Sequence, residues 1–220
     1  MVQKQGKKLL ALTCAGIASL VMSQSSHANL LVDGNFDTYV ASSAGDWVPF
    51  NGLAIGATTN ALSAPNAASG SDSTFGTPGA FENFAAAPGQ TFDLTGESKI
   101  TSLTTGAGGS YIASVQFTFW SGPNGTGTNL GTVQTAPGSA LLAPSPTVGQ
   151  VGTYTLVNTG PGTAPAGTAS GQAFVLIQAG NGDNITAFLD NLDLEPVPEP
   201  ASLSLIGLPL LGMAMRRRRN

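Results

Sequence analysis

The distribution of apolar and polar residues along the chain predicts short β-strands. Between residues 111 and 120 every second side chain is apolar, and most positions between them are polar, namely Ser114, Gln116 and Thr118. A period of two places the apolar set on one face of a strand and the polar set on the other. This segment therefore predicts a half-buried strand. Its apolar face consists of Tyr111, Ala113, Val115, Phe117 and Phe119.

Similar patterns predict further strands at residues 90–94, 99–103, 130–135, 153–158, 172–178 and 185–194. The Gly, Pro and Asn residues at positions 121–125 predict a turn, so the strand before them and residues 130–135 are expected to form a hairpin. No segment between residues 29 and 195 has a helical period. Many short strands with Gly and Pro between them must pair in two layers to bury their apolar sides. The predicted fold class is all-β, a single antiparallel β-sandwich resembling a jelly roll.

The N-terminal residues have the composition of a secretory signal peptide. Lys4, Lys7 and Lys8 precede an apolar run over residues 9–22, and small residues flank His27 in the Ser-His-Ala sequence that ends at Ala28. This order of basic, apolar and small residues is typical of a segment that is removed during export. We therefore expect the mature protein to begin near residue 29.

The C-terminal residues combine a Pro/Glu cluster, an apolar stretch over residues 201–215 and a run of arginines. Apolar side chains favour the bilayer, whereas the arginines are retained on the cytoplasmic side. Fifteen residues of helix reach about 22 Å, short of the ~30 Å hydrocarbon core, and Pro209 interrupts them. The stretch fits a transient span, which modest bilayer thinning can accommodate. An ordinary tail anchor and a terminal helix packed on the domain are the alternatives. The cluster is Val197, Pro198, Glu199 and Pro200, and the arginines are Arg216, Arg217, Arg218 and Arg219.

This order of Pro-Glu-Pro, apolar stretch and terminal arginines resembles the PEP-CTERM sorting domain of proteins exported by Gram-negative bacteria. The resemblance implies processing by the membrane enzyme exosortase near the Pro/Glu cluster, and signal peptidase at the other end. The chain then divides into a signal peptide (residues 1–28), an exported β-sandwich (29–195) and a sorting signal that ends in a hydrophobic helix and the arginines (196–220).

Removal of both ends leaves a strongly acidic domain. Between residues 29 and 200 the chain contains all twelve acidic residues and one basic residue, Lys99, which gives a formal charge of −11. Nucleic-acid binding requires a basic surface, so this class of function is excluded. The same region has no His and no Cys. Nucleophilic Ser-His-Asp and Cys-His sites and ordinary zinc sites are therefore excluded as well.

A second resemblance concerns the two ends of the exported domain. Residues 30–37, followed by Trp47, are similar to the opening strand of jelly-roll carbohydrate-binding modules and galactose-binding-like domains, and residues 187–192 are similar to their closing strand. The resemblance implies a structural calcium ion shared by Asp37 and Asp190. Carboxylate oxygens suit such a cation. The alternative is that Asp190 hydrogen-bonds a loop at the edge of the sandwich.

Sugar binding would require exposed aromatic side chains, and Trp120 is the best candidate because it ends a strand beside the predicted turn. Trp47 and Tyr111 are expected in the core. A glycoside hydrolase needs a pair of carboxylates, but the spacing of Glu82, Asp93 and Glu97 singles out no pair, so no catalytic residue is predicted. We expect a non-catalytic cell-surface or extracellular-matrix protein associated with exopolysaccharide or biofilm. The alternatives are a calcium-supported carbohydrate-binding module and, less favoured, a hydrolase.

Overall fold

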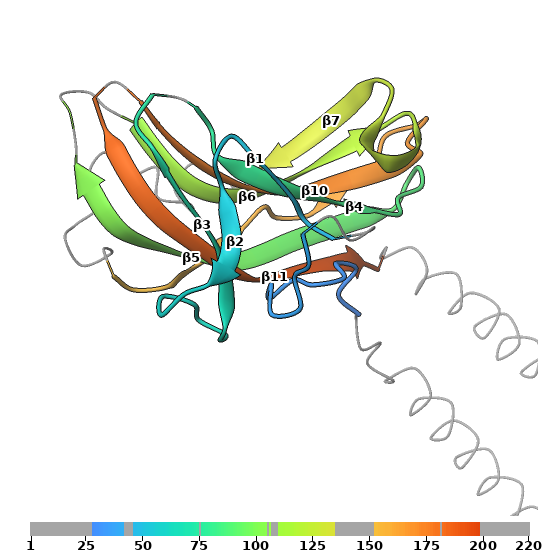
Figure 1. The fold of residues 1–220 in the computed structure, drawn as a ribbon. Coiled ribbons are helices and arrows are strands. Elements are labelled where there is room, and N and C mark those ends of the chain that lie inside the picture. Colours follow the sequence, from blue (N-terminus) through green and yellow to red (C-terminus); the bar gives the residue numbers. More distant parts are fainter. Residues whose placement is uncertain are drawn as a thin grey trace, which may run out of the picture.

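The computed structural model describes residues 28–41, 46–74, 76–104, 106, 110–134, 152–180 and 182–198. They form two antiparallel sheets that pack face to face, so the predicted all-β sandwich is confirmed (Figure 1). The five-stranded sheet has the order β1 (Val48–Phe50), β4 (Gly79–Phe84), β10 (Ser170–Gly180), β6 (Ser110–Trp120) and β7 (Asn129–Gln134).

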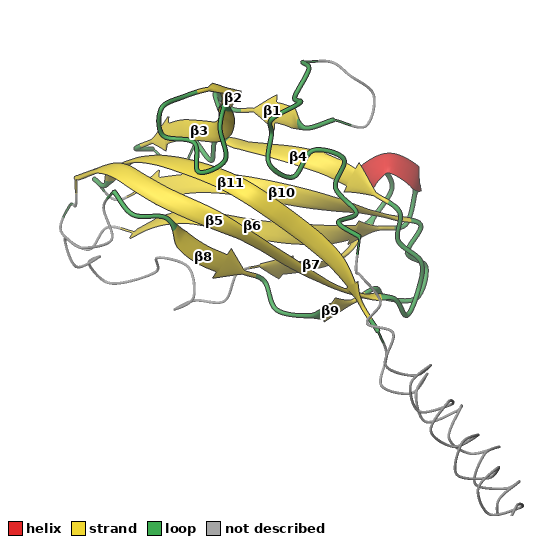
Figure 2. Ribbon diagram, turned by 90° about the horizontal axis from the view of Figure 1, so that it is seen from below, coloured by secondary structure: helices red, strands yellow, loops and turns green. Residues whose placement is uncertain are grey.

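The second sheet has six strands and contains the end of the described chain. Its order is β2 (Ala54–Ala57), β3 (Asn66–Asp72), β11 (Asn184–Val197), β5 (Thr91–Thr104) and β8 (Thr155–Asn158), and β9 (Gly162–Thr163) pairs with the start of β5. A single 3-10 turn, η1 (Pro123–Gly125), lies in the connection between β6 and β7 (Figure 2). No helix in the described part of the chain is long and apolar enough to cross a bilayer.

The strands predicted from alternation are present, but their limits differ in one instructive case. Residues 90–94 and 99–103 belong to one 14-residue strand, β5, because Gly96 and Ser98 continue its inward-facing row without large apolar side chains. The predicted hairpin is observed as β6 and β7. Strands β1 to β4 and β9 were not predicted. They are short, or, like β3, they carry small inward-facing residues such as Ala68.

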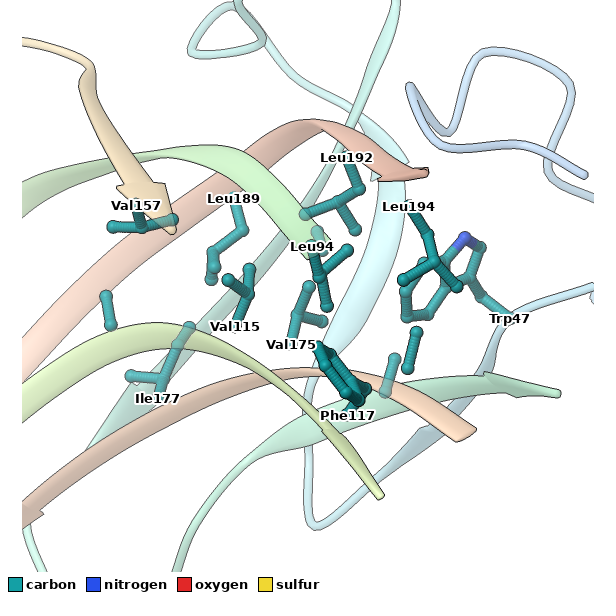
Figure 3. Packing of buried hydrophobic residues seen from close by; sticks show 14 of the residues in the cluster. Trp47, Leu94, Val115, Phe117, Val157, Val175, Ile177, Leu189, Leu192 and Leu194 are labelled. Atoms are coloured by element: carbon teal, nitrogen blue, oxygen red, sulfur yellow. The ribbon is translucent and has the colours of Figure 1, made fainter. Parts of the chain in front are cut away.

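The core lies between the two sheets and is filled by large side chains from both. Figure 3 shows Val115, Val175 and Ile177 facing leucines of the six-stranded sheet. Trp47 is 1% exposed and Tyr111 is 4% exposed, so both occupy the core as expected. The leucines are Leu94, Leu189, Leu192 and Leu194. Burial of side chains of this size contributes about 1.5–3 kcal/mol each to the free energy of unfolding.

The opening strand that the resemblance implied for residues 30–37 is not formed. Residues 29–41 make no strand, but hydrogen bonds fasten this N-terminal segment to β11. The Leu30 amide donates to the Leu194 carbonyl at 3.0 Å, and the Leu192 amide donates to the Gly34 carbonyl at 2.7 Å. Position 34 requires glycine, because a Cβ there would lie 2.0 Å from the Leu192 carbonyl oxygen. β11 itself continues to Val197, which is two residues past the predicted end of the domain.

Candidate functional site

The outward side of the five-stranded sheet carries three phenylalanines in contact. Phe81 of β4 and Phe174 of β10 are directly opposite each other in the register, and their ring centroids are 5.9 Å apart. Phe50 of β1 continues the group, 6.4 Å from Phe81. Because Ala80 and Val175 on the same strands are fully buried, the alternation turns the three rings away from the core. We call this surface the phenylalanine face.

Glycine makes room for the first of these rings. Gly79 lies opposite Phe50 in the pairing of β1 with β4. A Cβ on Gly79 would lie 2.5 Å from Cζ of Phe50 and 2.7 Å from the Val175 carbonyl oxygen. The ring of Phe50 therefore rests directly on the backbone of β4. A side chain at position 79 would push this ring off the sheet.

Side-chain amides and hydroxyls lie beside the rings on the same face. One row of the register contains Asn83, Gln172, Thr118 and Thr132. Within it the Gln172 amide donates to the Asn83 side-chain oxygen at 3.0 Å, and the two threonine hydroxyls are 3.0 Å apart. Gln116 is opposite Phe174 in the neighbouring row. The half-exposed members of the face are Phe50, Phe81, Asn83, Gln116, Trp120, Phe174, Leu176 and Gln178.

The phenylalanine face carries no formal charge. Glu82 is the single charged residue in the five strands, and its side chain points into the core, where it is 0% exposed. At one end of the face the η1 turn covers Gln172, since a Cβ on Gly125 would lie 2.1 Å from Nε2 of Gln172. A surface of aromatic rings beside amides can stack on the C–H faces of a sugar and hydrogen-bond its hydroxyls.

Trp120, predicted as the exposed aromatic, is half-buried at the end of β6 on this same face. Its backbone carbonyl accepts a hydrogen bond from the Ala169 amide at 2.8 Å, and its indole N–H is buried without a partner in the described structure. A role in ligand binding stays a prediction. The sequence reasoning overlooked Phe81 and Phe174. The signal that could have indicated this face was the outward row of the predicted strand at residues 172–178, in which Phe174 and Leu176 stand between two glutamines.

The outward side of the six-stranded sheet differs in charge. On β5 and β11, Asp93 is opposite Glu195 and Glu97 is opposite Asp190. Like charges at directly opposite positions disfavour pairing, so this region lowers the stability of the sheet. Lys99 is the only basic residue among the described ones, and its ammonium lies 5.6 Å from the ring centroid of Tyr154. We call this side the acidic face.

The structure places Asp190 against a loop. Its carboxylate accepts from the Leu62 and Ser63 amides at 2.8 and 3.0 Å, from the Ser63 hydroxyl at 3.1 Å and from the Asn191 amide at 2.8 Å. Burial raises the pKa of Asp190, and these donors oppose that effect. They occupy the lone pairs that a cation would use. These contacts agree with the alternative to a calcium ligand, in which Asp190 hydrogen-bonds a loop at the edge of the sandwich.

Asp37 accepts from the Asn35 side-chain amide at 2.7 Å through one oxygen, and its other oxygen is buried without a partner in the described structure. No described group of three or more His, Cys, Asp or Glu side chains is arranged to hold a metal ion. In this structure the donors around Asp190 do not fit a calcium ion shared with Asp37. The shared calcium ion stays a prediction.

The three carboxylates considered for hydrolysis do not meet. Glu82 points between the sheets, whereas Asp93 and Glu97 are on the acidic face of the other sheet. Four residues along one strand separate Asp93 from Glu97 by about 13 Å, at about 3.3 Å per residue. The carboxylate pairs of glycoside hydrolases are about 5–9.5 Å apart. These three residues therefore form no such pair.

Glu82 is unusual among the buried acids. One oxygen accepts from the Val32 amide at 2.7 Å, and the other is buried with no partner in the described structure. Burial raises the pKa of Glu82 to about 7, and the neighbouring charges of Asp46 and Asp33 act in the same direction. The carboxyl group thus fastens the N-terminal segment to β4.

A polar pocket of about 570 Å³ lies between the N-terminal segment and the bulge of β11. Asp33 and Asp193 are among its lining residues, and each has a buried carboxylate oxygen without a partner in the described structure. No aromatic ring lines this pocket. It is therefore a poorer match to a sugar than the phenylalanine face.

The sorting residues are only partly described. Val197 ends β11 opposite Thr91, and Pro198 follows it. The remaining motif residues and the arginine cluster lie outside the described residues, as does the predicted signal peptide up to residue 27. Residues 196–219 match the model of the PEP-CTERM protein-sorting motif. The chain carries a PEP-CTERM motif. This finding indicates export and a surface or extracellular location.

A search of curated protein sequences finds no match to the chain. Among solved structures, a cyclase from Fischerella sp. TAU superposes with a TM-score of 0.50 at 15% identity, over 79% of this chain and 98% of that one. The CBM22-1 xylan-binding domain from Paenibacillus barcinonensis Xyn10C gives 0.46 at 14% identity, over 76% and 93%. Carbohydrate-binding modules of families 61 and 16 are also among the structural neighbours.

Tailspike protein 4 of bacteriophage CBA120, described as an enzymatically active domain, gives a TM-score of 0.48 at 13% identity. It aligns with 77% of this chain, which spans only 21% of the tailspike chain. Similarity at such low identity shows the β-sandwich fold alone. The function of this protein must therefore be argued from its own surfaces.

Proposed function

We propose that this PEP-CTERM protein is a non-catalytic surface or extracellular protein that binds polysaccharide through the phenylalanine face. The sorting motif supports export, with signal peptidase and exosortase as the processing enzymes. The mature protein would then be released into, or held at, the layer of exopolysaccharide that surrounds the cell or builds a biofilm.

The contact between Phe81 and Phe174 beside an uncharged row of amides carries this proposal. Contiguous apolar side chains at a surface often mark a contact site, and here the rings of Phe81 and Phe174 lie in one row across adjacent strands. The amide and carbonyl groups of Asn83 and Gln116 supply both donors and acceptors, which a sugar hydroxyl needs. The face is formed by strands, so its side chains are held in fixed positions before any ligand binds.

The test is binding of the exported protein to a panel of purified polysaccharides, measured by affinity electrophoresis and calorimetry. We expect Phe81→Ala and Phe174→Ala each to weaken binding about tenfold, which corresponds to about 1.4 kcal/mol. Phe188→Ala is the matched control, because Phe188 is a half-exposed phenylalanine opposite Lys99 on the acidic face. Trp120→Ala tests whether the ligand extends to the end of β6.

Retention of the wild-type protein by no polysaccharide would overturn the carbohydrate proposal and favour a purely structural matrix role. Equal losses of affinity in Phe174→Ala and Phe188→Ala would mean that the sugar does not bind specifically at the phenylalanine face. Melting curves of all variants, recorded in parallel, separate lost binding from lost folding.

A further inference from the structure

The sandwich has one end at which several loops and the last residues of β11 meet, and this end adjoins the sorting segment. Residues 85–90 enter β5, residues 121–128 connect β6 with β7, and residues 159–169 precede β10. β11 ends beside them, since Val197 is opposite Thr91 at the start of β5. We call this the tether end. Figure 2 shows η1, β9 and the end of β11 on the same side of the molecule.

Hydrogen bonds join these loops into one surface. The Gly89 amide donates to the Ala164 carbonyl at 2.9 Å, and the Ala164 amide donates to the Gln90 carbonyl at 2.8 Å. The Gly125 amide donates to the Ser170 hydroxyl at 3.0 Å. The loops are thus held against each other and against the strands, and can meet a partner surface without rearranging.

The loops of the tether end carry no charge. The three loops contain no Asp, Glu, Lys or Arg. The nearest carboxylates on the strands, Asp93 and Glu195, are each two residues behind the last pair of β5 with β11. At about 3.3 Å per residue they lie about 7 Å from the end. None of the acidic residues lies in the loops themselves, whereas Glu199 lies in the connection that follows β11.

The chain is short between the sheet and the apolar stretch. Only residues 198–200 separate Val197 from the first residue of that stretch, Ala201. Three residues, or four Cα–Cα steps, span at most about 14 Å even when fully extended. Two of the three are prolines, which fix φ and limit how the connection can bend. A sheet that ends at Val197 cannot move far from a membrane that holds residues 201–215.

We propose that, before processing, the tether end rests against the lipid headgroups of the membrane. This inference depends on the membrane span that the proposed export route requires. Because the loops carry no charge, the headgroups of an anionic bilayer meet uncharged side chains first. The carboxylates of Asp93 and Glu195, about 7 Å behind them, contribute a partly screened repulsion, since the Debye length is about 8–10 Å. Both the phenylalanine face and the acidic face run away from this end. They stay open to the aqueous side while the protein is still tethered.

The proposal is tested on the unprocessed protein, made in a bacterium that lacks the sorting enzyme and reconstituted into lipid vesicles. The exported domain has no native cysteine, because Cys14 is the single one in the chain. Single cysteines at Ala87 and Ala166 report on the tether end, and cysteines at Ser73 and Thr104 report on the opposite end. All four side chains are exposed. Each site is labelled with a fluorophore and exposed to vesicles with nitroxide-labelled headgroups.

We expect severalfold stronger quenching at Ala87 and Ala166 than at Ser73 and Thr104, since β5 separates the two ends by roughly 40 Å. Equal quenching at both ends, in protein that resists alkaline extraction, would overturn the proposed orientation while leaving the membrane span intact. Release of the protein by alkaline extraction would instead overturn the span itself.

A charge substitution tests the surface separately from the short tether. With the fluorophore at Ala87, Ala166→Glu should reduce quenching in vesicles rich in phosphatidylglycerol and leave it unchanged in pure phosphatidylcholine. Thr104→Glu, at the far end, should change neither. If Ala166→Glu has no effect in anionic vesicles, the tether alone sets the distance and the uncharged surface does not contact the headgroups.

Discussion

The buried acids of this domain differ in their burial and in the number of hydrogen-bond donors that contact them, and both affect the pKa of the carboxyl group. Asp72 accepts from the amides of Ser73, Thr74, Gly76 and Ala179 at 2.8–3.1 Å. Burial alone would raise the pKa of Asp72, but these donors outweigh burial and lower it. Glu82, with one donor, has the opposite outcome. Glu82 is also more deeply buried than Asp72, so burial and the number of donors together decide whether an acid of this domain is charged or neutral near pH 7.

Glu82 is therefore expected to make stability depend on pH. Its pKa rises from 4.5 to about 7 on folding, so the folded protein binds this proton more tightly than the unfolded chain. The free energy of unfolding then falls as the pH rises from about 4.5 to about 7 and levels off above that. Glu82→Gln keeps an acceptor for the Val32 amide and should raise stability at pH 8 by about 2 kcal/mol.

Denaturant unfolding at pH 5 and pH 8 measures this effect. Glu97→Gln on the acidic face is the comparison variant: it removes a like-charge pairing with Asp190 and is expected to gain less stability at pH 8 than Glu82→Gln does. A Glu82→Gln protein with unchanged stability at both pH values would show that the glutamate is solvated in solution.

At the scale of the strands, glycines leave room for large side chains of the neighbouring strand to pack over the backbone. Gly171 of β10 is opposite Phe84 of β4, and a Cβ on Gly171 would lie 2.1 Å from Cζ of that ring. Gly131 of β7, in the same sheet, has Pro165 Cγ at 3.7 Å from the equivalent position, which is an ordinary contact. The two glycines occupy strands of one sheet but differ in what lies over them.

Gly171→Ala is expected to destabilise the protein by about 1–3 kcal/mol, because the ring of Phe84 must leave its place in the core. Gly131→Ala should be nearly neutral. Thermal unfolding of the two variants beside the wild type measures the difference. Similar melting temperatures for both variants would mean that Phe84 moves aside at little cost.

At the scale of the whole molecule, charge is segregated between the two broad faces. The phenylalanine face has none, whereas the acidic face carries Asp93, Glu97, Asp193 and Glu195. Two surfaces with such different charge suit different contacts. The uncharged face can approach a neutral polymer closely, and the acidic face keeps the domain soluble and repels other anionic surfaces.

This segregation predicts that polysaccharide binding is nearly independent of salt. Screening acts on interactions between charges, and the proposed site has none. We expect less than a twofold change in the dissociation constant between about 0.05 and 0.5 M sodium chloride, measured by calorimetry. A strong loss of affinity at high salt would place the ligand on a charged surface and contradict the proposed site.

The sequence by itself determined the fold class and indicated that the protein is exported. Alternation over residues 111–120 and 185–194 is strong because these strands have one face on the core, and a period of two reports that directly. The sorting motif is a linear signal, so its residues can be recognised without any tertiary contact. The expected core positions of Trp47 and Tyr111 followed from size alone.

Only the tertiary structure decided which side chains share a surface. Phe81 and Phe174 are 93 positions apart and meet because β4 and β10 pair in one register. β4 escaped prediction because its inward row contains the charged Glu82, a pattern that no hydrophobic period reveals. Three of the four donors around Asp190 come from residues 62 and 63, which lie more than a hundred positions away. Local pattern fixes which residues turn inward, whereas strand order and register, set by packing of the whole core, fix which of them meet.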